Sequence, residues 1–178
     1  MLKLFRTLIF VALASAFATP LFGQGITREL LVRPGDTVQV INATGRINVI
    51  AYKETTGIGD DSVSTITLSG SGSTDPSEND LRIDTGRGRH WITVSPANSA
   101  NRFDIALHLP ERVKLIATTR EGEVRAQGNF QSLAARTETG TIAADVPTFD
   151  LRYSLQWVAS RPRYLANFEI AGVKEKSA

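Results

Sequence analysis

The sequence predicts an all-β protein whose strands stack as a β-solenoid or β-roll. Three observations lead to this prediction. After the first 25 residues, apolar side chains recur at every second position, and no window of twelve or more residues has a convincing helical face. Turns containing Gly or Pro separate the alternating segments at regular intervals. Two segments also repeat each other at a constant offset, which is the pattern of stacked coils.

The first residues of the chain have the pattern of a secretory signal peptide. Lys3 and Arg6 form a short basic region, and Leu8–Phe17 is an uninterrupted run of apolar and small residues. A membrane anchor is the alternative, but a spanning helix needs about 20 apolar residues and a proline ends this run earlier. We therefore expect residues 1–24 to be a signal peptide cleaved within residues 18–24. The mature chain is then exported to the periplasm, the cell surface or the medium.

Composition and charge exclude several kinds of site and partner. The 178 residues include 20 Lys and Arg, 18 Asp and Glu and no Cys, so disulfides and thiolate metal sites are impossible. The predicted signal peptide holds two basic residues and no acidic one, which leaves 18 residues of each sign and a formal charge of zero. A neutral chain predicts no nucleic-acid partner. Arg87 and Arg89 form the one basic spot, and their Gly-rich turn is typical of a solvated loop. No transmembrane span is expected after signal cleavage.

Alternation between apolar and polar residues predicts the strands one by one. The clearest segments are Phe103–Leu109, Phe149–Trp157 and Ala166–Ile170. Shorter strands, in which Val and Thr are frequent, are predicted at Val38–Ile41, Arg46–Tyr52, Ser62–Leu68, Leu81–Asp84, Trp91–Ser95, Val113–Thr119, Glu123–Ala126, Leu133–Thr137 and Thr141–Val146. Residues 57–80 are rich in Gly, Ser and Asp, and around the strand predicted at their centre we expect loop structure, chiefly a mobile loop at Gly70–Asn79. Its aspartates, Asp60, Asp61, Asp75 and Asp80, are expected to be exposed rather than to form a Ca²⁺ site.

An internal repeat is the most informative feature of the sequence. Residues 115–126 (LIATTREGEVRA) align with residues 133–144 (LAARTETGTIAA) at an offset of 18, and residues 38–49 (VQVINATGRINV) resemble a third copy. A glycine occupies the same place in each copy, and we predict that it is a structural turn residue with a positive φ angle: Gly45, Gly122 and Gly140. The constant offset favours a solenoid or roll. Consecutive antiparallel hairpins in a β-sandwich are the alternative.

Short motifs within the repeat connect the chain to a known family. They are N-x-x-G-x-I-x-V at Asn42–Val49, a strand that ends in proline at Ile105–Pro110, and T-x-x-G-x-V/I units at Thr119–Val124 and Thr137–Ile142. In these motifs the chain resembles the bacterial DUF4097 group, often described as adhesin-like, over roughly residues 30–146. The resemblance implies an extracytoplasmic, repetitive all-β domain with no established catalytic residue.

The end of the chain departs from the repeat. Residues 147–178 have larger aromatic side chains and a Ser-Arg-Pro-Arg break. This segment resembles the stretch that follows such domains in longer secreted bacterial proteins with a von Willebrand A-type module. We therefore expect one β-rich domain over residues 25–178. Its last residues, 147–178, either complete the sheet or form a C-terminal extension that begins a missing module.

The sequence offers little material for catalysis or metal binding. His90 and His108 are the two histidines, and we expect both at the surface because a catalytic zinc site usually needs three protein ligands. The sequence has no nucleophile elbow, phosphate-binding loop or dinucleotide motif. Glu121 and Glu123 flank a turn glycine, where ion pairing with neighbouring arginines explains them better than glycoside chemistry. We expect no catalytic residue, no metal and no cofactor.

Aromatic side chains are the best candidates for contacts with a partner. Tyr153 and Trp157 fall on the apolar phase of a predicted strand and are expected in the core, whereas Trp91 and Tyr164 are predicted to be exposed. The sequence thus predicts a non-enzymatic exported β-domain, an adhesin-like binding or scaffold module at the cell envelope. Its partner is an unidentified protein or carbohydrate. The alternatives are a secreted enzyme that acts on polysaccharide and a component of envelope assembly.

Overall fold

The computed structural model describes residues 25–53, 62–70, 74–149, 151–156 and 165–167. Regular structure in these residues consists of ten strands and one short 3₁₀ turn, which confirms the all-β prediction. The chain divides into two parts, Met1–Val146 and Pro147–Ala178, and the ten strands belong to the first. The predicted signal peptide lies outside the described residues. No helix in the described part of the chain has the length and apolar character that crossing a membrane requires.

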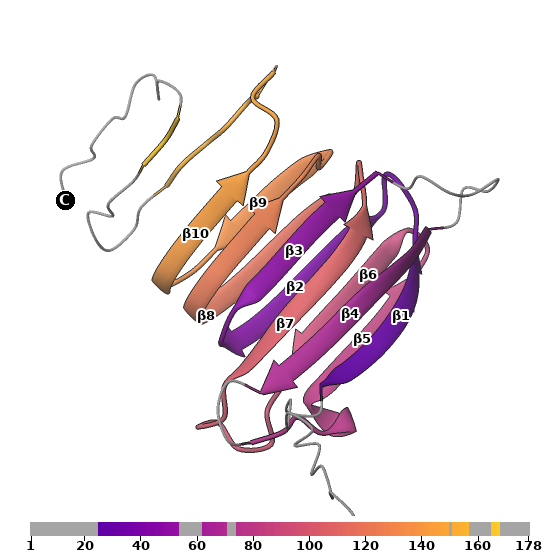
Figure 1. The fold of residues 1–178 in the computed structure, drawn as a ribbon, viewed down its shortest axis with the longest axis vertical. Coiled ribbons are helices and arrows are strands. Elements are labelled where there is room, and N and C mark those ends of the chain that lie inside the picture. The colour runs from indigo at the N-terminus through magenta and orange to yellow at the C-terminus, as the bar shows by residue number, and fades with distance from the viewer. Residues whose placement is uncertain (1–24, 54–61, 71–73, 150, 157–164, 168–178) are drawn as a thin grey trace, which may run out of the picture. The chain divides into compact units, whose positions relative to one another are not determined.

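Figure 1 shows the strands in their places in the sheet. In chain order they are β1 (Ile26–Val32), β2 (Thr37–Thr44), β3 (Ile47–Tyr52), β4 (Ser62–Gly70), β5 (Leu81–Gly86), β6 (Arg89–Val94), β7 (Phe103–Pro110), β8 (Lys114–Gln127), β9 (Ser132–Arg136) and β10 (Thr139–Asp145), and the turn η1 (Glu78–Asp80) precedes β5. β8 covers two of the predicted strands, because the chain stays paired through the bend at Gly122.

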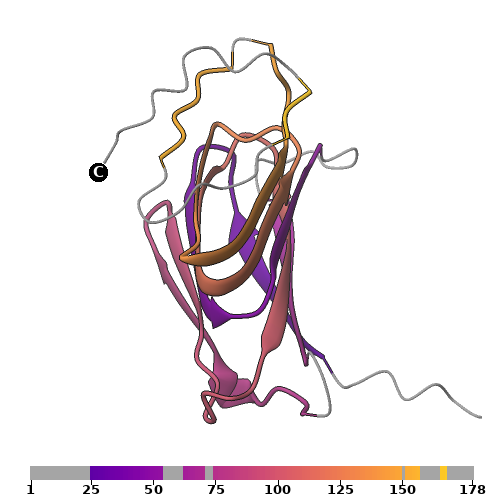
Figure 2. The same ribbon diagram turned by 90° about the vertical axis from the view of Figure 1, so that its left-hand side faces the viewer.

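The sheet curls into two facing layers (Figure 2). Layer A runs in the order β1, β4, β7, β3, second half of β8, β10. Layer B runs in the order β5, β6, β2, first half of β8, β9. β8 belongs to both layers, because each of its halves pairs with a different pair of strands. The bend in β8 therefore joins the two layers.

The parallel strands pair with the same residue offset as the sequence repeat. β8 pairs with β9 and β10 at an offset of 18 residues, so that Leu115 lies beside Leu133 and Val124 beside Ile142. β2 and β3 pair with β8 at a common offset of 77 residues. The three copies of the repeat thus stack on one another, each as a strand, a bend and a strand. β1, β4 and β7 pair antiparallel with one another, as do β5 and β6, so the whole sheet is mixed.

The hydrophobic core fills the space between the layers. Alternate residues of each central strand point inward and are fully buried, as the period of two predicts. The largest of them are Phe103, Ile105, Leu107 and Leu109 on β7, Ile66 and Leu68 on β4, Ile47 on β3, Ile92 on β6 and Leu115 on β8. Each such side chain contributes about 1.5–3 kcal/mol by leaving water. The outer faces of both layers therefore rest on one continuous buried core.

The glycines of the repeat form a column at the bends. Gly45, Gly122 and Gly140 have φ angles of 115°, 147° and 155°. A Cβ atom on Gly122 would collide with the carbonyl group of Gly45, and one on Gly140 would collide with the carbonyl group of Gly122. The three bends therefore nest so closely that a side chain has no room at these positions.

A buried polar residue ties β2 to β7 beside this column. The side-chain amide of Asn42 is fully buried, and its Nδ2 donates a hydrogen bond of 2.8 Å to the carbonyl oxygen of Phe103. The register places Asn42 beside Thr119 of the next copy, which is also buried. Asn42 thus satisfies a carbonyl group at the start of β7, inside the bend of the stack.

Two predicted strands are absent from the described residues, and one strand was missed. The predicted strand Phe149–Trp157 contains no strand in its described residues: Phe149 is 88% exposed, and Tyr153, expected in the core, is 41% exposed. Alternation indicates which side chains share a face. It does not show whether a neighbouring strand is present to form hydrogen bonds with the backbone. The same holds for Ala166 and Asn167 of the last predicted strand. The remaining residues of both segments lie outside the described residues. β1 was not predicted, because its apolar residues do not alternate.

Asp80 is buried and caps the turn η1, which corrects the prediction of an exposed acidic loop at this position. Its carboxylate accepts hydrogen bonds from the backbone N–H and hydroxyl of Ser77, at 2.7 and 2.8 Å, and from the backbone N–H of Ala97 at 2.9 Å. Burial raises the pKa of Asp80, but these hydrogen bonds outweigh burial and lower the pKa overall. The ionised carboxylate therefore stabilises the connection into β5.

The variant Asp80→Asn is expected to lower the free energy of unfolding at pH 7 by about 1.5–3 kcal/mol, the range for hydrogen bonds to a charged group. Because the folded pKa lies below the unfolded value of about 3.9, the wild-type advantage is complete above that pH and fades as pH falls through the folded pKa. Urea unfolding at pH 7 and about pH 2.5 measures this difference. The exposed Asp84→Asn serves as control, and an equal loss for Asp80→Asn at both pH values would contradict the role of the charge.

Candidate ligand-binding face

The outward side chains of layer B form a regular grid, because neighbouring strands pair in register. Its central row, here named the Trp91 row, consists of Asp84, Trp91, Gln39, Ile116 and Ala134 from β5, β6, β2, β8 and β9. The row on one side consists of Gly86, Arg89, Thr37, Lys114 and Ser132. The row on the other side consists of Arg82, Thr93, Ile41, Thr118 and Arg136.

Trp91 is the largest side chain on this face. Its indole is 38% exposed, and its six-membered ring lies against Gly86 on the neighbouring strand, where a Cβ atom would be 3.4 Å from Cζ3. An aromatic ring over a strand glycine protects the backbone of an edge hairpin, so Trp91 has a structural role as well. Ile41 and Ile116 are 38% and 37% exposed and extend the apolar area across β2 and β8.

Positive charge surrounds this apolar area. Arg82 is neutralised by Asp84, with 2.7 Å between Nε and Oδ2. Arg89, Lys114 and Arg136 are exposed, and among the described residues none of them has an ion-pair partner. The face therefore combines an aromatic ring, aliphatic side chains and three uncompensated cations.

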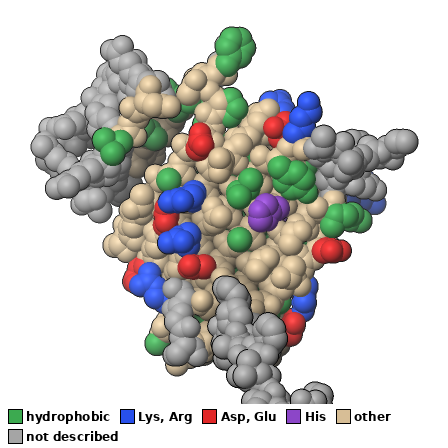
Figure 3. All heavy atoms as spheres, viewed as in Figure 1, with side chains coloured by type: hydrophobic (Ala, Val, Ile, Leu, Met, Phe, Trp, Pro, Cys, Tyr) green, Lys and Arg blue, Asp and Glu red, His purple; other side chains and the backbone are tan. Residues whose placement is uncertain are grey.

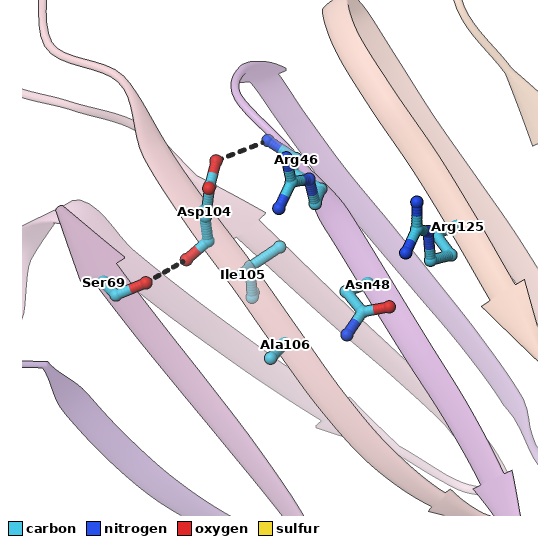
Figure 4. Close-up of a pocket in the computed structure, with 7 residues that line it drawn as sticks. All are labelled: Arg46, Asn48, Ser69, Asp104, Ile105, Ala106 and Arg125. Atoms are coloured by element: carbon cyan, nitrogen blue, oxygen red, sulfur yellow. Dashed lines mark hydrogen bonds between the residues drawn. The ribbon is translucent and has the colours of Figure 1, made fainter. Parts of the chain in front are cut away.

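The outer face of layer A has a different character (Figure 3), with cationic and anionic side chains interspersed. This face has a hollow of about 230 Å³. Arg46, Asp104 and Arg125 line it with their neighbours, as Figure 4 shows. Glu123 accepts hydrogen bonds of 3.0 Å from both arginines, and Asp104 accepts the backbone N–H of Arg46 at 2.8 Å. Because its charges are already paired, this hollow is the weaker candidate for a ligand.

The two histidines lie in different surroundings. His108 is exposed on layer A, but His90 is buried, which corrects the prediction of a surface residue. Nε2 of His90 lies 3.2 Å from Oδ2 of Asp36, and that oxygen also accepts the backbone N–H of Arg33. The pair fastens the connection before β2 to β6 and points into the core. The described residues contain no group of three or more His, Asp or Glu placed to hold a metal ion.

The predicted site residues fall in three places. Trp91 lies on the outer face of layer B, and Tyr164 lies outside the described residues. The turn glycines form the column at the bends and take no part in this face. Gln39 and Ile116 were missed, because their place beside Trp91 depends on the pairing of β2 with β6 and β8. Arg89, interpreted as part of a solvated loop, begins β6 and lies beside Thr37.

Comparison with known proteins gives distant structural likenesses. No family model and no curated protein matches the chain. A candidate cell adhesion protein from Clostridium sporogenes is 13% identical with a TM-score of 0.42, over 69% of this chain and 61% of that one. A candidate adhesin from Parabacteroides merdae is 12% identical with a TM-score of 0.38, over 70% and 53% of the two chains. A candidate lipid binding protein from Parabacteroides distasonis is 12% identical with a TM-score of 0.34, over 70% and 60%.

The chain spans between 53% and 61% of the length of these three proteins. Their identities and TM-scores are too low to carry a conclusion about function. The geometry of the two outer faces is therefore the basis for a functional proposal.

Proposed function

We propose that this protein is an exported, non-enzymatic binding module that contacts its partner through the outer face of layer B. The observation that carries the proposal is the Trp91 row, in which an exposed indole, an amide and an aliphatic side chain lie side by side on three paired strands. Export rests on the signal-peptide pattern of residues 1–24. We further propose that the stacked repeat is a short β-solenoid with antiparallel additions, of the adhesin-like DUF4097 kind.

The physical properties of the face suit binding. Tryptophan and arginine are enriched among the residues that dominate binding energy, and both are exposed here within two residues of each other on β6. Gln39 lies between Trp91 and Ile116 and offers a donor and an acceptor to a ligand. The buried core beneath fixes the strands that carry these side chains, so the backbone of the face needs no ordering on binding.

The charge arrangement favours binding over catalysis. An enzyme that hydrolyses polysaccharide needs a pair of carboxyl groups that flank the scissile bond. Asp84 supplies the carboxylate in the grid of layer B, and it forms an ion pair with Arg82. The hollow in layer A presents carboxylates that arginine side chains and a backbone N–H already engage. A polysaccharide-acting enzyme is therefore the less favoured alternative.

The variant Trp91→Ala is expected to weaken binding to a cell-envelope fraction roughly tenfold or more, because truncating a dominant interface residue costs about 2 kcal/mol. Co-sedimentation of the purified mature chain with envelope from the producing bacterium measures the affinity. His108→Ala, on the outer face of layer A, is the matched control and should bind as the wild type. Trp91→Phe keeps a ring over Gly86 and separates loss of binding from loss of stability. Unchanged binding by Trp91→Ala would contradict the proposal.

A further inference from the structure

We infer that the ligand of this face is a polysaccharide that carries carboxylate groups, an inference that rests on the proposed function. The apolar surface needed to stack a sugar ring and the cations needed to bind acid groups occur together on layer B. On layer A both arginines of the hollow are paired with Glu123, and Asp104 supplies a second negative charge that balances them. The charge difference between the two faces carries the inference.

Three cations lie around the Trp91 row without acidic partners among the described residues. Arg89 and Lys114 belong to the row on one side, and Arg136 belongs to the row on the other. Hydrogen bonds between a guanidinium or ammonium group and a carboxylate are about twice as strong as neutral ones, and arginine makes them in pairs. Such groups gain most from a ligand that brings its own negative charge.

The spacing of the cations suits an extended ligand that crosses the strands. Arg89 and Lys114 lie on β6 and β8, with β2 between them, so their backbones are about 9.6 Å apart, two strand spacings. Trp91 follows Arg89 by two residues on the same face, a distance of about 6.6 Å along the strand. A sugar ring stacked on the indole can therefore place an acid group within reach of the Arg89 guanidinium.

Two other kinds of anionic partner fit this face less well. Insertion into a membrane needs protruding apolar side chains. Trp91, Ile41 and Ile116 do not protrude in this way, because each is less than two-fifths exposed. Nucleic-acid affinity grows with the number of phosphates that Lys and Arg neutralise, and the grid offers three cations that lack an acidic partner among the described residues. An acidic polysaccharide can bind through fewer charged contacts than a nucleic acid, because its sugar rings also stack on the indole of Trp91.

Three matched pairs of ligands test the inference. The intrinsic fluorescence of Trp91, measured in a Trp157→Phe background, is titrated with polygalacturonate, polymannuronate and hyaluronate, each beside its carboxyl-reduced neutral form. We expect at least one acidic polymer to bind roughly tenfold more tightly than its neutral form, and this preference to shrink as salt is raised. The double variant Arg89→Gln/Lys114→Gln should lose most of the preference. Arg125→Gln, on layer A, should keep it.

The outcomes separate the inference from the proposed function. The variant Trp91→Ala lacks the fluorescent reporter, so its binding to the same polymers is measured by isothermal titration calorimetry. Equal binding of the acidic and neutral forms, still lost in Trp91→Ala, would overturn the acidic nature of the ligand and leave the assignment of the binding face intact. The assignment of a polysaccharide ligand would also be overturned if none of these polymers bound. Tighter binding to phosphatidylglycerol vesicles or duplex DNA would overturn it as well. Binding that survives both Trp91→Ala and Arg89→Gln/Lys114→Gln would place the site elsewhere, and the proposed function would fail with the inference.

Discussion

Replacing Gly122 by alanine is expected to lower the free energy of unfolding by about 3 kcal/mol or more. Gly122 has a φ angle of 147°, and an added Cβ would collide with the carbonyl group of Gly45. The backbone at Gly45 cannot retreat easily, because its own Cβ position faces the carbonyl group of Phe103. Relieving the collision would separate β8 from β2 and β3, to which it is hydrogen-bonded on both sides of the bend.

Gly35→Ala is the matched control for this prediction. Gly35 also has a positive φ angle, 93°, but the nearest neighbour of an added Cβ is the side-chain Oε1 of Gln131, 4.0 Å away. This variant carries the backbone strain without the collision, so we expect a loss of about 1 kcal/mol. Urea unfolding followed by circular dichroism compares the two variants. A loss in Gly122→Ala no greater than in Gly35→Ala would mean that the bends are not in close contact.

The variant Asn42→Asp is expected to be nearly as damaging, with a loss of about 3 kcal/mol or more at pH 7. The change keeps the size of the side chain but replaces the Nδ2 donor with a carboxylate oxygen that faces the carbonyl group of Phe103. Asn42 is fully buried, so the new charge would lack both water and a donor. At low pH the protonated acid can donate the lost hydrogen bond, and part of the stability should return.

Asn42→Thr tests whether charge is the cause. Threonine is the residue beside this position in the next copy, at Thr119, so it fits the stack and stays neutral. It loses the hydrogen bond to the carbonyl group of Phe103, for which we expect a cost of about 1–3 kcal/mol. Unfolding at pH 7 and about pH 4 distinguishes the variants. Equal, pH-independent losses in both would show that burying the charge is not the dominant effect.

The stacking register could be predicted because each copy of the repeat meets the same geometric demand. A glycine is needed wherever one bend nests in the next, and inward positions must be apolar on both sides of it, so residues 115–126 and 133–144 share both features. β1 gave no such signal, because it lies at the end of layer A and buries Ile26 and Val32 with mainly exposed residues between them. Alternation in residues 149–157 was misleading, since it carries no information about a pairing partner.

The binding face could be predicted only in part. The sequence singled out Trp91 as an exposed aromatic residue, and that residue lies on the proposed face. It gave no means of placing Gln39 or Ile116 beside it, because those contacts arise from pairing between distant segments of the chain. His90 was misplaced for the same reason: its partner Asp36 is 54 residues away, and the contact forms only when β2 and β6 pair.

Backbone amide chemical shifts, followed during titration with the tightest-binding acidic polymer, test the role of layer B most directly. We expect the largest changes on its outer face, at Thr37, Gln39, Arg89, Trp91 and Ile116, with small changes around the hollow of layer A. The indole N–H signal of Trp91 should move with the same affinity as the amides. Changes centred on Arg46, Asn48 and Arg125 instead would contradict the assignment of the binding face.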